Sequence, residues 1–221
     1  MWKNLKTKKY RDAEGMFLVY GEHLIEKAKQ KDAIVEIIST HEKGQNTVIS
    51  KDLMDELQQA ETYFDDLAVC KKTNPKIVSN KVLMLDDVQD PDNVGALIRS
   101  AAAFGFLHVI VSLKSADFYN EKTIRASKGS IFDVYLERRP LEDAIVELKA
   151  KDYQIVYADA HEKGNDIKHE KVVLILGNEG HGISDRVKSL ADRSIHIMTK
   201  NVESLNVSVA GGILMYEWRN L

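Results

Sequence analysis

Polar side chains with a spacing suited to ligand binding stand near the end of the chain, in the segment Ser204-Leu205-Asn206-Val207-Ser208. The residues that follow are mostly apolar, so the segment resembles a buried helix. A buried polar group without a partner costs on the order of 1–3 kcal/mol, and a purely structural helix would carry Leu or Ile here. An N-cap accounts for Ser204 or Asn206, but not for both together with Ser208. The pattern therefore predicts a bound ligand.

Two further polar segments follow runs that are typical of buried strands. Segment 90–99 comes after the apolar run 82–85, and the glycine-rich segment 177–182 comes after the apolar run 172–176. In α/β proteins, ligands collect outside the carboxyl ends of parallel strands. We therefore expect the polar segments to meet at one edge of a sheet and to form a common site.

These three segments, in this order and at these separations, resemble the signature motifs of the SpoU (TrmH-type) RNA 2'-O-methyltransferases of the SPOUT superfamily. The resemblance implies a methyl transfer from S-adenosylmethionine to a ribose 2'-hydroxyl of RNA, with ribosomal RNA favoured. Segment 10–25 is similar to the opening of the small substrate-binding domain that many of these enzymes carry. That domain in turn resembles RNA-binding ribosomal proteins.

The resemblance assigns roles to individual residues. It makes Arg99 the catalytic arginine; because a pKa above ~12 makes arginine a poor base, we expect it to bind a phosphate and stabilise the developing 2'-oxyanion. The other side chains implied to form the catalytic pocket are Asn93, Glu179, Ser204 and Asn206. The residues implied to contact the cofactor are Gly177, Asn178, His196, Met198 and Leu205.

Simpler interpretations compete with these roles. Asn93 also suits the N-cap of a helix that begins near Val94, and Glu179 suits a solvated loop carboxylate. Arg99 lies off the apolar stripe of its helix, so without the resemblance a solvent-facing side chain is the better interpretation. The family has an aliphatic residue and Pro where this chain has His196-Ile197. A backbone contact tolerates His196, whereas a side-chain contact would change the affinity for the cofactor.

The pattern of elements predicts two α/β domains, 1–75 and 80–221, divided in the polar, Pro-containing stretch 71–75. The N-terminal domain is expected to be ribosomal-protein-like, with strands 17–20, 34–38 and 47–49 and helices 23–29 and 51–59. The C-terminal strands are expected at 82–85, 109–112, 133–136, 155–159, 172–176 and 194–198, with helices at 141–149 and 183–189. Their alternation predicts a parallel sheet covered on both faces. The resemblance implies a deep trefoil knot in this domain.

The charge balance restricts how the chain can hold RNA. It carries 31 basic and 34 acidic side chains, a formal net charge of −3, so RNA binding must rely on a local patch. One candidate is the basic N-terminal segment that ends at Arg11, although a solvated arm explains it nearly as well. The second candidate is Arg125 with Lys128, because the family places a similar segment beside the RNA entrance.

Other features limit location and partners. The sequence has no apolar run of the ~18 residues that a membrane span needs and no secretory leader, so we expect a cytoplasmic protein. The single cysteine, Cys70, excludes an internal disulfide and a cysteine-based zinc site, and we expect no metal. The resemblance implies homodimers whose active sites use both subunits, with the apolar segment 207–218 as a partner surface. The alternatives are a tRNA methyltransferase and a non-catalytic RNA-binding protein of this fold.

Overall fold

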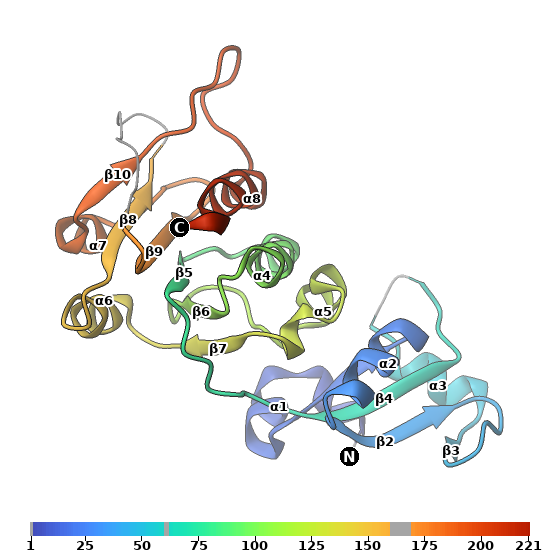
Figure 1. Cartoon of the computed structure of the whole chain (residues 1–221). Helices are drawn as coiled ribbons and strands as arrows, with labels where there is room; N and C mark the ends of the chain where they lie inside the picture. The colour runs from blue at the N-terminus through green and yellow to red at the C-terminus, as the bar shows by residue number, and fades with distance from the viewer. Residues whose placement is uncertain (1, 60–61, 160–168) are drawn as a thin grey trace.

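Two β-sheets, one in each half of the chain, organise the protein (Figure 1). The computed structural model describes residues 2–59, 62–159 and 169–221. Elements of the N-terminal half are η1 (Trp2–Lys6), α1 (Lys8–Glu14), β1 (Met16–Tyr20), α2 (Glu22–Gln30), β2 (Ile34–Ser39), β3 (Thr47–Val48), α3 (Lys51–Leu57) and β4 (Asp66–Lys71). Its sheet has the order β1-β4-β2-β3, and β4 is antiparallel to both neighbours.

The C-terminal half contains a six-stranded sheet of order β10-β8-β9-β5-β6-β7, and every neighbouring pair is parallel. This confirms the predicted parallel α/β architecture, whereas the knot stays a prediction. The elements are β5 (Lys81–Asp86), α4 (Pro91–Phe104), β6 (His108–Val111), α5 (Glu121–Ser127), η2 (Ser130–Phe132), β7 (Tyr135–Arg138), α6 (Leu141–Lys149), β8 (Gln154–Ala158), β9 (Val172–Gly177), α7 (Asp185–Leu190), β10 (Arg193–Ile195), α8 (Val207–Glu217) and η3 (Trp218–Asn220).

The central strand β5 shows why both faces of this sheet are covered. Successive side chains of a strand point to opposite faces, and here all of them are buried. Leu83 and Leu85 pack in the core beneath α4 and α8, whereas Val82 and Met84 pack in the core beneath α6 and α7. Figure 1 shows α4, α5 and α8 on one side of the sheet and α6 and α7 on the other.

Four elements differ from the sequence prediction: β4, α5, η1 and α1. Strand β4 was missed, although it is the strand between β1 and β2; its buried run Leu67–Cys70 is continuous and lacks the alternation of a half-exposed strand. Helix α5 was also missed. The basic N-terminal segment is no solvated arm, because it folds into η1 and α1. Among the described residues no helix is both long and apolar enough to cross a membrane.

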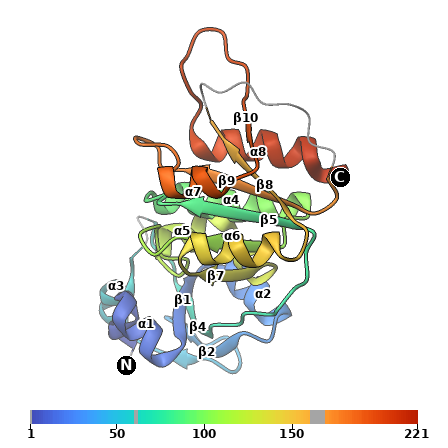
Figure 2. The same ribbon diagram turned by 90° about the vertical axis from the view of Figure 1, so that its left-hand side faces the viewer.

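The two halves lie against each other (Figure 2), and side chains from both belong to one hydrophobic core. The ring of Phe17 lies 4.7 Å from that of Tyr119 and 5.9 Å from that of Phe132, measured between centroids. The connecting segment is also fixed, since Asn74 exchanges two hydrogen bonds of 2.9 Å with the backbone of Leu136 on the edge strand β7. Removing residues 1–75 would therefore expose apolar core surface of the C-terminal half.

Candidate functional site

The three polar segments of the sequence meet beyond the carboxyl ends of β5 and β9. The Nδ2 of Asn93 donates a hydrogen bond of 2.8 Å to Glu179 Oε1. The Nδ2 of Asn206 donates one of 3.1 Å to Asn93 Oδ1. A single buried amide on α4 thus links the loop after β9 to the start of α8, and we call this the Glu179–Asn93–Asn206 network.

The start of α4 explains how Asn93 becomes available for this network. Asp90 is the N-cap, and its carboxylate accepts a hydrogen bond of 2.9 Å from Asp92 N. Pro91 occupies the first helical position, where a missing N–H costs nothing. The predicted N-cap role of Asn93 is therefore wrong: Asn93 lies inside the first turn, and its buried side chain pairs across to the two other segments.

The loop after β9 is closed by its own backbone. Asn178 and Gly182 exchange two N–H···O bonds of 3.0 Å. The side chain of Asn178 accepts from Gly180 N and His181 N at 2.8 and 3.1 Å and donates to Asp87 O at 2.9 Å. A Cβ at Gly177 would lie 2.4 Å from the carbonyl carbon of Gly182. The close approach of the backbone within the loop therefore requires glycine at position 177. The hydrogen bonds of the Asn178 side chain hold the loop in this conformation.

A buried carboxylate that the sequence reasoning missed holds the far end of this loop. Asp86, the last residue of β5, is 6% exposed. Its Oδ2 accepts a hydrogen bond of 2.8 Å from Ser184 N, and β5 pairs Asp86 with Gly177 in register. Asp86 and Asp87 therefore fasten both ends of the loop that carries Glu179. The signal was present as two acidic residues directly after a buried apolar run.

The polar residues before α8 have a more local explanation than the sequence suggested. Asn206 is the N-cap of α8, and its Oδ1 accepts from Ser208 N at 2.8 Å and from Ser208 Oγ at 2.6 Å. Ser204 and Asn206 are exposed, so they do not interrupt a buried helix. The argument from buried polar groups is therefore wrong for these residues. The evidence for a ligand site here is instead that Ser204 and Asn206 line a cavity.

A cavity of about 650 Å³ opens between the loop after β9 and the segment before α8. The predicted site residues that line it are Gly177, Asn178, Glu179, Ser204, Leu205 and Asn206. Its other lining residues include Leu176, Ile183, Ile195, Ile197 and Ala210, which are apolar, and Asp159, Lys188, Thr199 and Glu203, which are polar. Volumes of a few hundred to about 1,000 Å³ with apolar walls and few polar groups are typical of small-molecule sites.

Two predicted cofactor contacts do not line this cavity. The Nδ1 of His196 lies 3.2 Å from Asp159 O, and Met198 is 89% exposed. The residues that line the cavity at this place are Ile195, Ile197 and Thr199. An extended backbone turns alternate side chains to opposite sides, so the Ile-His-Ile pattern itself favours the two isoleucines over His196.

Arg99 lies apart from the Glu179–Asn93–Asn206 network of its own chain. It is exposed on α4, six positions after Asn93, and does not line the cavity. Within the described part of the chain it has neither a hydrogen bond nor an ion pair. One copy of the chain therefore brings together Asn93, Glu179, Ser204 and Asn206 but leaves Arg99 outside.

The candidate RNA-binding residues differ in their exposure to solvent. Arg11 is 5% exposed, and its guanidinium donates to Leu5 O at 3.0 Å and to Asp117 Oδ2 at 2.6 Å. A buried, paired arginine cannot contact RNA, so this prediction is wrong. Lys3 and Lys8 also form ion pairs, with Glu56 and Asp12 respectively. Lys3, Lys8 and Arg11 of the N-terminal basic segment thus have partners within the protein.

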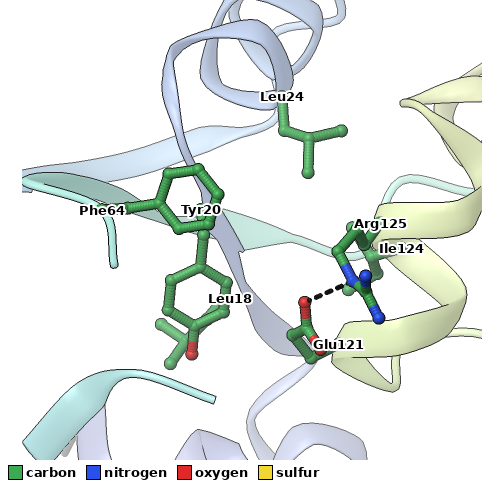
Figure 3. A pocket seen from close by; sticks show the side chains of 7 residues that line it. All are labelled: Leu18, Tyr20, Leu24, Phe64, Glu121, Ile124 and Arg125. Carbon is green, nitrogen blue, oxygen red and sulfur yellow. Dashed lines mark ion pairs between the residues drawn. The ribbon is translucent and has the colours of Figure 1, made fainter. Parts of the chain in front are cut away.

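Arg125 and Lys128 lie at the interface between the two halves. Arg125 Nε is 3.3 Å from Glu121 Oε1, beside a cavity of about 20 Å³ that Tyr20 and Phe64 help to line (Figure 3). Burial raises the pKa of the Glu121 carboxyl. Lys128 is exposed at the C-cap of α5. The small cavity holds no more than about one water.

Comparison with known proteins covers the whole chain. Residues 80–216 match the SpoU rRNA Methylase family, and residues 1–82 match the MRM3-like substrate binding domain. The 23S rRNA (guanosine(2553)-2'-O)-methyltransferase RlmP of Bacillus subtilis (strain 168) is 37% identical over 99% of this chain and 94% of that protein.

Solved structures agree in fold along the full length. The SpoU methyltransferase AviRb from Streptomyces viridochromogenes, in complex with the cofactor AdoMet, has a TM-score of 0.86 at 25% identity, over 99% of this chain and 95% of that one. An rRNA methyltransferase from Sinorhizobium meliloti has a TM-score of 0.87 at 25% identity, over 99% and 92% of the two chains. Together with the sequence matches, these likenesses show that the chain belongs to the SpoU RNA methyltransferase family and carries the N-terminal substrate-binding domain.

Proposed function

We propose that the protein transfers a methyl group from S-adenosylmethionine to a ribose 2'-hydroxyl of ribosomal RNA, in the cytoplasm. The observation that carries the proposal is the Glu179–Asn93–Asn206 network at the mouth of a cavity of about 650 Å³. The full-length likeness to RlmP supports ribosomal RNA over tRNA as the substrate. Such a network can position a ribose, and correct geometry supplies much of the rate of a two-substrate transfer.

The cavity suits S-adenosylmethionine in both size and chemistry. Leu176, Ile195, Ile197 and Leu205 give it apolar walls that fit a flat adenine ring, and Asn178 and Thr199 add polar groups. When bound, the cofactor supplies an electrophilic methyl group on a positively charged sulfur. Backbone groups of the braced loop 177–182 would hold it, since the hydrogen bonds within that loop fix their directions.

The chain's own polar residues would orient the ribose. Glu179 Oε1 accepts from Asn93, which leaves Oε2 to accept a hydrogen bond from a ribose hydroxyl. Asn93 is held from its other side by Asn206, so the carboxylate is fixed before RNA arrives. Ser204, exposed at the cavity, supplies a hydroxyl beside Asn206. Preorganised polar groups of this kind contribute most where charge develops.

We further infer that the site is completed in a homodimer. Arg99 is exposed and lies outside the network of its own chain, so a second subunit is needed to bring an arginine to the reacting oxygen. Helix α8 offers a surface for pairing: Val209, Ile213 and Tyr216 are 51%, 36% and 51% exposed and stand at positions i, i+4 and i+7, on one side of the helix. In the partner, Arg99 would bind the RNA phosphate and stabilise the 2'-oxyanion.

Calorimetric titration with S-adenosylmethionine tests the proposal, with NAD as the control ligand. We expect micromolar binding of S-adenosylmethionine and none of NAD. The titration is then repeated after addition of ribosomal RNA, and again with tRNA. Absence of cofactor binding in every mixture would favour a non-catalytic RNA-binding protein of the same fold.

A further inference from the structure

The walls of the cavity are more acidic than basic. Its ionisable lining residues are Asp159, Glu179, Glu203, Lys188 and His181. Lys188 Nζ lies 2.8 Å from Asp159 Oδ2, so these two charges compensate each other. The remaining carboxylates belong to Glu179 and Glu203, which have no ion pair within the described residues. Among the described lining residues, the cavity therefore has two carboxylates without an ion pair.

The two carboxylates come from the two different segments that line the cavity. Glu179 belongs to the loop after β9 and is held by Asn93 at 2.8 Å. Glu203 belongs to the segment between β10 and α8 and is exposed. A cationic ligand in this cavity would be attracted by both carboxylates. Because the cavity is partly open to water, the attraction is moderate and weakens as salt is added.

The proposed reaction changes the charge of the molecule that occupies this cavity. The methyl carbon leaves the sulfonium, and the electron pair of the C–S bond stays on sulfur. The ribose oxygen uses a lone pair to form the new C–O bond, and its proton passes to water. The cofactor thus enters with a positive sulfur and leaves as a neutral thioether, while its amino-acid and adenosine groups are unchanged.

We propose that Glu203, together with Glu179, makes the cavity selective for the sulfonium cofactor over its thioether product, S-adenosylhomocysteine. The inference rests on the proposed function, because it assumes that S-adenosylmethionine occupies this cavity. Glu203 is the specificity-determining residue that can be changed separately, since Glu179 also belongs to the Glu179–Asn93–Asn206 network. As a consequence, methyl transfer converts the cofactor into the more weakly bound S-adenosylhomocysteine, which favours release of this product.

Calorimetry on the full-length protein tests this selectivity. Three ligands are titrated at low and at high salt: S-adenosylmethionine, S-adenosylhomocysteine, and sinefungin, whose ammonium group replaces the sulfonium. The variants are Glu203→Gln and the charge-matched control Glu42→Gln, in an exposed loop of the N-terminal domain. Circular dichroism verifies that each variant is folded.

We expect Glu203→Gln to weaken binding of the two cationic ligands by about threefold to fivefold, the range for a partly solvated charge pair. Binding of S-adenosylhomocysteine should stay unchanged, and Glu42→Gln should change nothing. The preference of the wild-type protein for cationic ligands should shrink at high salt. Equal weakening of all three ligands, or no change in any, would overturn the role of Glu203. If neither S-adenosylmethionine nor its product binds, the proposed function itself fails.

Discussion

The two walls of the cavity are built in opposite ways. The wall after β9 is fastened by paired backbone bonds between Asn178 and Gly182 and by the buried carboxylate of Asp86. The wall before α8 extends away from the sheet in both ribbon views (Figures 1 and 2). Its tip carries one internal bond, from Thr199 Oγ1 to Val202 O at 2.6 Å, and an exposed Met198.

This difference separates two tasks. The fastened wall holds Glu179 in one place against Asn93, which suits the orientation of reacting groups. The open wall contributes apolar contacts and Glu203 while leaving the cavity accessible. Substitutions in the fastened wall should therefore lower the rate of transfer, whereas most substitutions at the tip of the open wall should change little.

The largest effect on methyl transfer is expected at Arg99, which belongs to neither wall of the cavity in its own subunit. Arg99→Ala should lower methyl transfer by about 10²–10³-fold, the usual cost of losing a group that stabilises a developing oxyanion. Cofactor affinity should stay near the wild-type value, since Arg99 does not line the cavity. Single-turnover transfer and calorimetry measure the two quantities. Retained turnover would remove Arg99 from the mechanism.

A mixed dimer shows whether Arg99 acts across subunits. When Arg99→Ala and Glu179→Gln chains are co-expressed, about half of the dimers are mixed, and each mixed dimer has one intact site if Arg99 serves the partner. We expect about a quarter of the wild-type activity, although each variant alone is inactive. No recovery would place Arg99 and Glu179 in the same subunit's site.

The anchoring of the fastened wall is tested at Asp86. Asp86→Ala removes the charged acceptor of the Ser184 N–H, which should destabilise the protein by about 1–3 kcal/mol. The loop that carries Glu179 loses an anchor, so kcat should fall by about tenfold, which corresponds to about 1.4 kcal/mol. Asp86→Asn retains an acceptor oxygen and should recover most of kcat. Urea unfolding and steady-state kinetics distinguish the two effects. If kcat is unchanged in Asp86→Ala, the anchor does not matter for transfer.

The link between the walls is tested at Asn206. Asn206→Ala removes the N-cap of α8 and the bond to Asn93, and loss of a cap costs about 1 kcal/mol. Asn206→Asp keeps the capping oxygen but cannot donate to Asn93 Oδ1. We therefore expect both variants to transfer methyl groups slowly, and only the alanine variant to unfold at lower urea. Normal turnover of the aspartate variant would contradict a role for this link.

The smallest effect is expected at the exposed tip of the open wall. Met198→Ser should change the free energy of unfolding by less than about 0.5 kcal/mol and leave cofactor affinity unchanged. Ile197→Ser is the matched comparison, because Ile197 lines the cavity; it should weaken cofactor binding. Loss of affinity in Met198→Ser would return this residue to the set of cofactor contacts.

Much of the fold could be predicted because its strongest signals are local. The apolar runs of β5 and β9 and the periodic helix α6 (Leu141–Lys149) depend on neighbouring residues alone. Arg11 could not be placed in this way, since its partner Asp117 is distant in sequence and reaches it only in the folded chain. Charge alone favoured RNA contact, whereas tertiary packing made this arginine part of the interface between the two halves.

The same distinction between local sequence signals and tertiary contacts applies to the site. The motifs identified Asn93, Glu179 and Asn206, but not that the buried Asn93 amide pairs with both of the others. Met198 was assigned from the motif, yet the backbone turns Ile195 and Ile197 into the cavity. Asp86 was overlooked because its role depends on the Ser184 N–H, which belongs to a loop on another strand.

Transfer of a labelled methyl group tests the central claim most directly. Ribosomal RNA from a strain that lacks this protein is incubated with methyl-labelled S-adenosylmethionine and the wild-type or Glu179→Gln protein, with tRNA in parallel. The labelled nucleotide is then identified by nuclease digestion and mass spectrometry. We predict label on one ribose 2'-oxygen of ribosomal RNA with the wild-type protein only. Label on a base, or no label in either RNA, would contradict a 2'-O-methyltransferase.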